Sequence, residues 1–540
     1  TPSELPYLSI SQAELDELVA LQGGEVDNIQ AIYPLSPLQE GILFHHLIAQ
    51  QDDPYLLRSM FKLDHQAALD SFVLALEKIV ERHDALRTGI HWRNLEQPLQ
   101  VVQRAVNLKP HYLDTSTGNR RTEAEAQQQI QGFFNKAIEQ FDIAKPPLIE
   151  LAVSEIKDGY LLGIQAHHII ADHQALEQIF YEIKLILSGE QDQLSAPVPY
   201  SHYVLQQRKE SRAEHEDYFR GLLSGYDTPA FVFDEHRDNL PRQDIQITEA
   251  TLDAMRFNQL AAAARNANVS LSSIAHLAWG LVLSACSGRC DVVFGTVLSG
   301  RAMGRPAPDS VVGLFINTVP VRINNSAGHN PLLPDALTGL HHQLSELTLH
   351  EHAPLALIKR CSDVAAELPL FNTLLNYRHK QSTGAEETLQ QLGKRGVTPL
   401  ALEQSSHYPI ALSINESDTS LALALQTASS VNSALILDFY QTALDRIASQ
   451  LQHNSPCTLG QISVLPDAFR DNIVRHVARN QPSRLKPLPA HIRFEHTANC
   501  LPDKIAIKSG ADTLTYAQLN TRANQIANRL IKAGVQANDR

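Results

Sequence analysis

The residues of this chain that are best suited to acid–base chemistry are histidines, because an imidazole exchanges a proton near pH 7. Among its 24 histidines, three adjacent pairs occur, namely His45-His46, His167-His168 and His341-His342. The third pair lies in an amphipathic helical pattern without a neighbouring glycine turn or acid, which indicates an ordinary helix surface. The second pair ends an apolar run and precedes Asp172 and His173. This second arrangement is the strongest candidate for chemistry.

The second pair is placed by a strand and a helix. Residues 160–170 predict an apolar strand, in which alternate side chains face opposite sides. His168 then shares a face with Ile164, while His167 points the other way. Asp172 falls at the start of the next helix, where a carboxylate is favoured. The same helix end disfavours a nearby imidazolium and leaves a neutral ring that can accept a proton. The competing interpretation is a packed strand end with a capping aspartate.

The elements around the pairs indicate a mixed α/β chain with several boundaries. Residues 1–25 predict a linker with a short helix that Ser11 and Glu14 cap as a capping box. The predicted blocks that follow are one lobe at 26–187, a second lobe at 188–470, a polar linker at 471–490 and a new pattern at 491–540. Helical spacing is clearest at 69–80 and at 176–183, and the last block opens with a strand, a turn and an amphipathic helix.

Composition excludes several classes of function. Lys+Arg 45 against Asp+Glu 59 gives a formal net charge of −14, and no Lys/Arg block occurs, so binding to nucleic-acid phosphates is not expected. The most apolar stretch, 271–286, is shorter than a membrane span and predicts a buried helix. The five cysteines are scattered without zinc spacing, which predicts reduced thiols, no metal site and a cytoplasmic protein.

The segment His167-His168-Ile-Ile-Ala-Asp172-His173 resembles the His-His-x-x-x-Asp-Gly motif of condensation domains from nonribosomal peptide synthetases. Further motifs of that family occur in its order over about residues 26–470. They are Tyr33-Pro-Leu-Ser-Pro-Leu-Gln39-Glu-Gly, Arg82-His-Asp-Ala-Leu-Arg87-Thr, Phe294-Gly-Thr-Val-Leu-Ser-Gly-Arg301, Val312-Gly-Leu-Phe-Ile-Asn317-Thr-Val, Glu351-His-Ala-Pro-Leu and Leu370-Phe-Asn-Thr-Leu-Leu-Asn-Tyr377-Arg. The segment from Leu514 to Asn524 resembles the first motif of an adenylation domain, and residues 1–25 resemble a linker that leaves an upstream carrier protein.

The resemblance implies two lobes, each similar to chloramphenicol acetyltransferase, in a V-shaped pseudo-dimer with a central tunnel. It implies peptide-bond formation between donor and acceptor thioesters. The domain itself would bind no cofactor, because its substrates arrive on the 4'-phosphopantetheine arms of upstream donor and downstream acceptor peptidyl carrier proteins. An adjoining adenylation domain, truncated at 491–540, is the other expected partner, with neither nucleic acid nor a membrane involved.

The first histidine pair gains a meaning from this resemblance. His45-His46-Leu-Ile-Ala-Gln-Gln-Asp52-Asp53 resembles the His-His-[Ile/Leu]-x4-Gly-Asp signature of the dual epimerisation/condensation branch, with Asp52 at the glycine position. His173 stands where most condensation domains carry glycine, which agrees with that branch. The alternatives are a plain condensation domain and a degenerate domain that serves only as a docking platform.

The chemistry assigns a role to each candidate residue. Condensation needs two positioned substrates, help for the ammonium in losing its proton, and a stabilised oxyanion. His168 is the candidate for the proton role, and backbone N–H groups of the next helix are candidate oxyanion donors.

The remaining candidates support or extend that chemistry. We expect His167 to be buried support, and the resemblance makes Arg87, with Arg82 second, the partner of Asp172. Epimerisation needs a second proton carrier, for which His45 and His46 are equal candidates in what we expect to be a helix.

Overall fold

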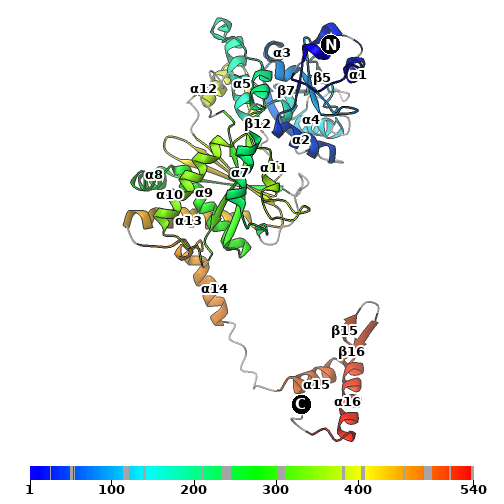
Figure 1. The fold of residues 1–540 in the computed structure, drawn as a ribbon, viewed down its shortest axis with the longest axis vertical. Coiled ribbons are helices and arrows are strands. Elements are labelled where there is room, and N and C mark those ends of the chain that lie inside the picture. The colour runs from blue at the N-terminus through cyan, green and yellow to red at the C-terminus, as the bar shows by residue number, and fades with distance from the viewer. Residues whose placement is uncertain are drawn as a thin grey trace. The chain divides into compact units, whose positions relative to one another are not determined.

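The computed structural model describes residues 1–5, 7–22, 24, 26–48, 53, 55–113, 121–137, 141–208, 211–232, 245–301, 311–326, 328–379, 384–402, 408–453, 456–479, 489–509 and 512–536. The chain divides into two compact units, Thr1–Leu465 and Pro466–Arg540 (Figure 1).

Within these described ranges, three sheets form the framework of the Thr1–Leu465 unit. The first lobe is built on the order β12 (Val397–Leu402), β2 (Leu56–Leu63), β7 (Gly159–His167), β6 (Ile149–Ile156), β5 (Pro110–Tyr112). The second lobe is built on the order β10 (Asn317–Asn324), β9 (Asp291–Leu298), β11 (Thr373–Arg378), β13 (Ile410–Glu416), β14 (Leu421–Ala428), β8 (Ile245–Leu252). A third sheet has the order β1 (Ile29–Pro34), β4 (Leu99–Gln103), β3 (Thr88–His91).

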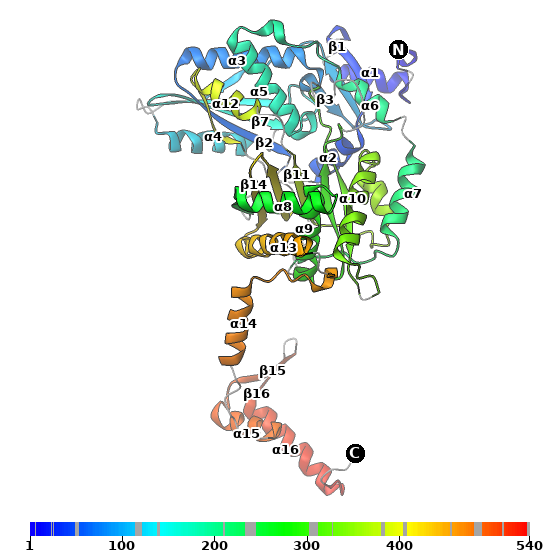
Figure 2. The same cartoon turned by 90° about the vertical axis from the view of Figure 1, so that its left-hand side faces the viewer.

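Helices cover the faces of these sheets. In the first part of the chain they are α1 (Gln12–Leu21), α2 (Pro37–Ile48), α3 (Gln66–Arg82), α4 (Glu123–Ala137), α5 (His173–Ser188), α6 (Tyr200–Gln207) and α7 (Arg212–Leu223). Then follow α8 (Ala254–Asn266), α9 (Leu271–Ser287), α10 (Leu333–Leu349), α11 (Leu355–Arg360), α12 (Gly384–Gly393) and α13 (Ser433–His453). The helices α8, α9 and α13 pack together on the second lobe (Figure 2).

Local sequence rules account for the elements nearest the second histidine pair. The apolar spacing at 69–80 forms α3, whose side chains Leu69, Phe72 and Ile79 are fully buried. The predicted helix after Asp172 is α5, and it ends at Gly189 in the left-handed conformation. The strand before α5 is shorter than the predicted range 160–170, because β7 ends at His167 and residues 168–170 form a 3-10 turn.

The simple division into lobes at 26–187 and 188–470 needs a correction. Strand β12 pairs antiparallel with β2, and α12 packs against α5, so residues from the second block complete the first lobe. Figure 2 shows α12 in yellow beside the blue and cyan elements of the first lobe. The edge of β2 is thereby covered, which protects a strand that would otherwise expose unpaired backbone groups.

The Pro466–Arg540 unit contains α14 (Asp467–Arg479), α15 (Ala490–Cys500), β15 (Ile505–Ser509), β16 (Asp512–Thr515) and α16 (Tyr516–Lys532). The strand and the helix expected after residue 503 thus occur, and Thr515 caps α16 with Gln518 completing a capping box. The turn expected between them lies at residues 510–511, outside the described residues. In the segment predicted as a linker, 471–490, α14 continues to Arg479, and residues 480–488 lie outside the described residues.

The apolar stretch at 271–286 forms the buried helix α9, as predicted. Among the described residues, no single helix has the length and apolar composition of a membrane span. Only α8 and α9 taken together meet that criterion, and they are bent by 103° at their junction.

Candidate active site

His168 follows directly on β7 and begins the 3-10 turn that leads into α5. Its backbone N–H donates to the carbonyl oxygen of Tyr55 at 2.7 Å, which fixes the turn against the start of β2. The side chain is half-buried, and its Nδ1 atom is buried without a hydrogen-bond partner among the described residues. Burial lowers the pKa of the imidazole, so the ring is neutral at pH 7. A neutral ring with an unpaired nitrogen fits the proton role predicted for His168.

Asp172 is fully buried and caps α5 as predicted. Its Oδ1 accepts the N–H of Ala175 at 2.8 Å and lies 3.3 Å from Nη2 of Arg301. Its Oδ2 accepts the N–H of Phe315 at 2.9 Å. Because Arg301 follows β9 and Phe315 precedes β10, this carboxylate ties the start of α5 to the segments that flank these two strands of the second lobe. The guanidinium of Arg301 also lies 3.8 Å from the ring centroid of Phe315, which shields the ion pair from water.

The expectation that Arg87 is the partner of Asp172 is therefore wrong. Arg87 is buried in the 3-10 turn after α3, where its guanidinium donates to the carbonyl of Val80 at 3.0 Å and to Gln30 at 2.8 Å. Arg82, the second choice, pairs with Glu182 of α5 at 2.9 Å. Both arginines hold elements of the first lobe together, so neither is available to Asp172.

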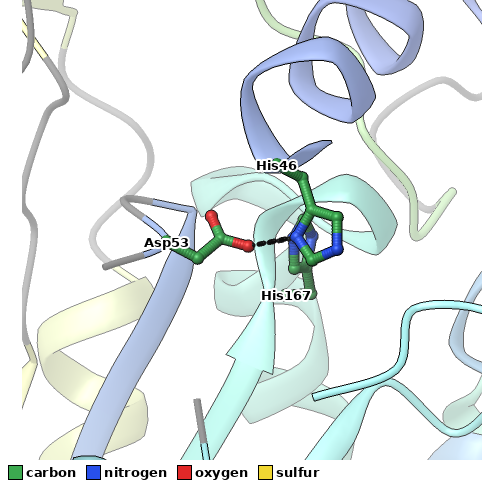
Figure 3. A group of neighbouring side chains, drawn as sticks. All are labelled: His46, Asp53 and His167. Carbon is green, nitrogen blue, oxygen red and sulfur yellow. Dashed lines mark hydrogen bonds and ion pairs between the residues drawn. The ribbon is translucent and has the colours of Figure 1, made fainter. Parts of the chain in front are cut away.

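His167 is fully buried, whereas His168, the first residue of the 3-10 turn, is half-buried. The Nε2 of His167 lies 3.1 Å from Oδ2 of Asp53, and its Nδ1 accepts the N–H of Ile169 at 3.1 Å. The same Asp53 oxygen lies 2.5 Å from Nδ1 of His46 (Figure 3). One carboxylate thus links the first histidine pair to the second.

The helix that carries the first pair is held at this site by Gln39. The Nε2 of Gln39 donates to the carbonyl oxygen of Ile169 and to Gln100, both at 2.9 Å. The side chain is almost completely buried. Since Ile169 follows His168 directly, Gln39 connects the start of α2 to the turn of the second motif.

The structure distinguishes the two members of the first pair. Both lie on α2, as expected, but only His46 joins Asp53, and its ring centroid is 5.4 Å from that of His167. His45 instead faces Phe44 and Tyr55, with centroid distances of 5.8 and 6.1 Å. His46 is therefore the member that geometry brings to the second motif.

Two other predicted features lie at the edge of the site or outside it. His173 is the first residue of α5 and pairs with Glu177 at 3.3 Å, where its side chain is 36% exposed. Asp52, which replaces the glycine of the dual signature, lies outside the described residues.

His46, Asp53 and His167 offer three ligand atoms that lie within 4.8 Å of one another, so a metal site must be considered. The proton positions argue against it. The Nδ1 of His167 already accepts the Ile169 N–H, so a metal on Nε2 would require a ring without any proton. A metal-bound histidine normally donates from its other nitrogen. The donor set fits a hydrogen-bonded group better than a metal centre.

Sequence reasoning missed Asp53 and Arg301 as site residues, although both stand inside motifs that it recognised. Asp53 is the last residue of the signature that begins at His45, and its spacing from the pair was the available signal. Arg301 ends the motif that starts at Phe294, but nothing in its spacing connects it to Asp172, which lies 129 positions away.

Comparisons with known proteins give the family of the chain. A family model described as a condensation domain matches residues 29–474, and one described as an AMP-binding enzyme matches residues 494–540. Malpibaldin synthetase of Mortierella alpina is 36% identical over 548 residues, which cover 100% of this chain and 10% of that protein. Tyrocidine synthase 2 of Brevibacillus parabrevis is 27% identical over 529 residues, covering 94% of this chain and 14% of that protein. The chain thus spans only a small part of the length of these relatives.

Solved structures show the same fold. The condensation domain of monacolin K polyketide synthase aligns with a TM-score of 0.63 at 17% identity, over 80% of this chain and 100% of that one. A four-domain nonribosomal peptide synthetase bound to AMP and glycine aligns with a TM-score of 0.68 at 16% identity, over 94% of this chain and 39% of that one. The predicted two-lobed α/β fold is confirmed. The chain belongs to the condensation-domain family of nonribosomal peptide synthetases and continues into the start of an AMP-binding domain.

Proposed function

We propose that this chain forms a peptide bond between a donor peptidyl or aminoacyl thioester and the amine of an acceptor aminoacyl thioester. The proposal is supported by a neutral His168 with an unpaired, buried Nδ1. The bond forms when the acceptor amine attacks the donor thioester carbon and the donor thiol leaves. His168 positions the amine and takes up the proton that it loses, a role worth about 10²–10⁴-fold in rate. Asp172 holds the turn of His168 rigid by tying α5 to the second lobe.

We further propose that the donor Cα is first inverted from L to D. Inversion removes a proton from one face of Cα and returns one to the other, which one base does not readily do. The observation that carries this proposal is the link from His46 through Asp53 to His167, because it brings a second imidazole to the motif that contains His168. Once Asp53 accepts the proton of His46 Nδ1, its Nε2 is the nitrogen left to exchange a proton with Cα.

The proposed reaction determines which protein domains must act together with this chain. Both substrates are held as thioesters on phosphopantetheine arms, so we infer that an upstream donor and a downstream acceptor carrier protein deliver them at the two ends of a tunnel between the lobes. The adenylation domain that begins near residue 494 is the neighbour that would load the acceptor. We infer a cytoplasmic location, in keeping with free cysteines throughout the described residues.

Deuterium exchange at the donor Cα tests the epimerisation step and separates the two histidines. A donor carrier protein loaded with an L-aminoacyl thioester is incubated with the chain in deuterated buffer, and deuterium at Cα is measured by mass spectrometry. We expect His46→Ala to lower exchange by about 100-fold or more. The matched variant His45→Ala keeps most of it, since His46 is the member of the pair that contacts Asp53.

Condensation of a donor supplied as the D-epimer is the control, and it should survive in His46→Ala because His168 remains. Loss of both activities together with stability would mean that His46 is only structural. Absence of exchange in the unmutated chain, with an L-configured product, would identify a plain condensation domain.

A further inference from the structure

Asp53 is the point at which the two histidine motifs meet. Its Oδ2 lies 2.5 Å from Nδ1 of His46 and 3.1 Å from Nε2 of His167, while its Oδ1 accepts the backbone N–H of Tyr55 at 2.9 Å. The side chain of Asp53 is only 7% exposed. Burial raises the pKa of Asp53, but the hydrogen bonds from His167 and His46 outweigh it and hold the pKa well below its usual range. The carboxylate is therefore ionised and accepts every one of these bonds.

The proton of His167 can be placed from its contacts. An imidazole that is neutral has one N–H donor and one bare acceptor nitrogen. The N–H of Ile169 points at Nδ1 of His167, so Nδ1 is the bare nitrogen and Nε2 carries the proton. That Nε2–H then donates to Asp53. Burial lowers the pKa of His167, which keeps the ring in this neutral form.

The proton of His46 follows in the same way. Since Asp53 is an acceptor only, the short contact requires a proton on Nδ1 of His46. We propose that Asp53 is a positioning residue for both motifs, which fixes the proton on Nδ1 of His46 and on Nε2 of His167 and so leaves Nε2 of His46 as the nitrogen of that ring that exchanges a proton with substrate. The value of this arrangement for catalysis rests on the proposed epimerisation, whereas the proton positions follow from the contacts of Asp53 and Ile169 alone.

Asparagine cannot replace Asp53 in either orientation of its amide. If the amide oxygen faces Tyr55, the NH₂ group faces both imidazoles and demands a bare Nδ1 on His46 and a bare Nε2 on His167. A bare Nδ1 on His46 means that its proton moves to Nε2. A bare Nε2 on His167 means that its proton moves to Nδ1, where it would oppose the N–H of Ile169. If the oxygen faces the imidazoles, the NH₂ group meets the N–H of Tyr55, and two donors oppose each other.

Nitrogen NMR of the 540-residue chain labelled with ¹⁵N-histidine tests the proposal directly. Long-range ¹H–¹⁵N correlations show which ring nitrogen is protonated, and the variants His46→Gln and His167→Gln assign the two signals. We expect Nδ1–H for His46 and Nε2–H for His167 in the unmutated chain. A proton on Nε2 of His46, or on Nδ1 of His167, overturns the proposal, and the variants serve only to assign signals that are read in the unmutated chain.

Asp53→Asn provides the second measurement. We expect the His46 proton to move to Nε2 and Cα exchange to fall by about 10²–10⁴-fold, as when a base loses its orienting carboxylate. Asp53→Glu should recover part of the exchange because it restores an ionised acceptor. Asp70→Asn is the matched control, because Asp70 is an exposed carboxylate that accepts a hydrogen bond from Gln66 of the same helix. Unchanged His46 signals in a folded Asp53→Asn protein overturn the proposal.

The two proposals fail in different ways. If the unmutated chain shows no Cα exchange but has the expected ring protons, epimerisation is refuted and the role of Asp53 stands. If exchange is present but the ring protons lie elsewhere, epimerisation stands and the role of Asp53 is refuted.

Discussion

Replacement of Asp172 by Asn changes the charge at the buried junction of the two lobes with almost no change in volume. Asp172 uses both oxygens: Oδ1 accepts from Ala175 and Arg301, and Oδ2 accepts from Phe315. An asparagine has only one acceptor oxygen, so its NH₂ group must face at least one of these donors. The placement that keeps Ala175 and Arg301 bonded turns the NH₂ group toward the N–H of Phe315.

The cost follows from two effects. A buried backbone N–H left without an acceptor costs about 1–3 kcal/mol. Removal of one partner from a buried ion pair typically costs about 3–5 kcal/mol, and Arg301 is itself only 8% exposed. Because the two effects concern the same group and overlap, we expect the free energy of unfolding to fall by about 3–5 kcal/mol. In a unit of the size of Thr1–Leu465 that corresponds to a decrease in Tm of roughly 3–5 °C.

Tryptophan fluorescence is the suitable assay, because both tryptophans, Trp92 and Trp279, lie in the Thr1–Leu465 unit. The matched control is Asp253→Asn, since Asp253 also caps a helix but is exposed, and asparagine caps as well as aspartate. A Tm of Asp172→Asn equal to that of the control would refute the buried ion pair as the link between the lobes.

Three further predictions follow from the site and its surroundings. His168→Ala should lower peptide-bond formation by about 10²–10⁴-fold with an unchanged Tm, and near-normal product formation in a carrier-protein assay would contradict its role. Arg87→Ala should lower the Tm but leave condensation near normal at a temperature where the variant is folded, because Arg87 does not reach Asp172; an equal loss of activity to that of His168→Ala would contradict this. Burial lowers the pKa of His276 to about 4, so stability should fall as the pH drops from about 6.5 to about 4, where only the unfolded chain takes up the proton. His276→Gln should flatten this decline in Tm, and an identical decline would exclude His276 as a cause.

Local signals in the sequence were sufficient for the elements near the candidate site. The helix after Asp172 and the capping box of Ser11 and Glu14 follow from rules that act over a few residues. These rules depend on the backbone geometry of a single helix or strand, so they need no knowledge of the rest of the chain.

Contacts between distant segments could not be obtained in this way. Arg301 was missed as the partner of Asp172 because its choice over Arg87 depends on how the second lobe meets α5. Strand β12 joins the first sheet by pairing with the edge of β2 that β7 does not occupy, which depends in the same way on packing between distant segments. In both cases the decisive interaction is set by packing, which leaves no periodic signal.

The choice between His45 and His46 illustrates the same point within one motif. Adjacent helical residues differ by about 100° in direction, and the sequence does not fix which direction faces the second motif. The structure settles the direction through Asp53, which His46 reaches and which also binds His167.

The configuration of the condensed product is the most direct test of the proposed function. A donor carrier protein loaded with the L-aminoacyl or L-peptidyl thioester and an acceptor carrier protein with its amino acid are incubated with the chain, and the product is resolved by chiral chromatography. A dipeptide or peptide with the D configuration at the donor residue is the predicted result. A product that retains the L configuration would contradict epimerisation, and no product from either donor epimer would contradict condensation as well.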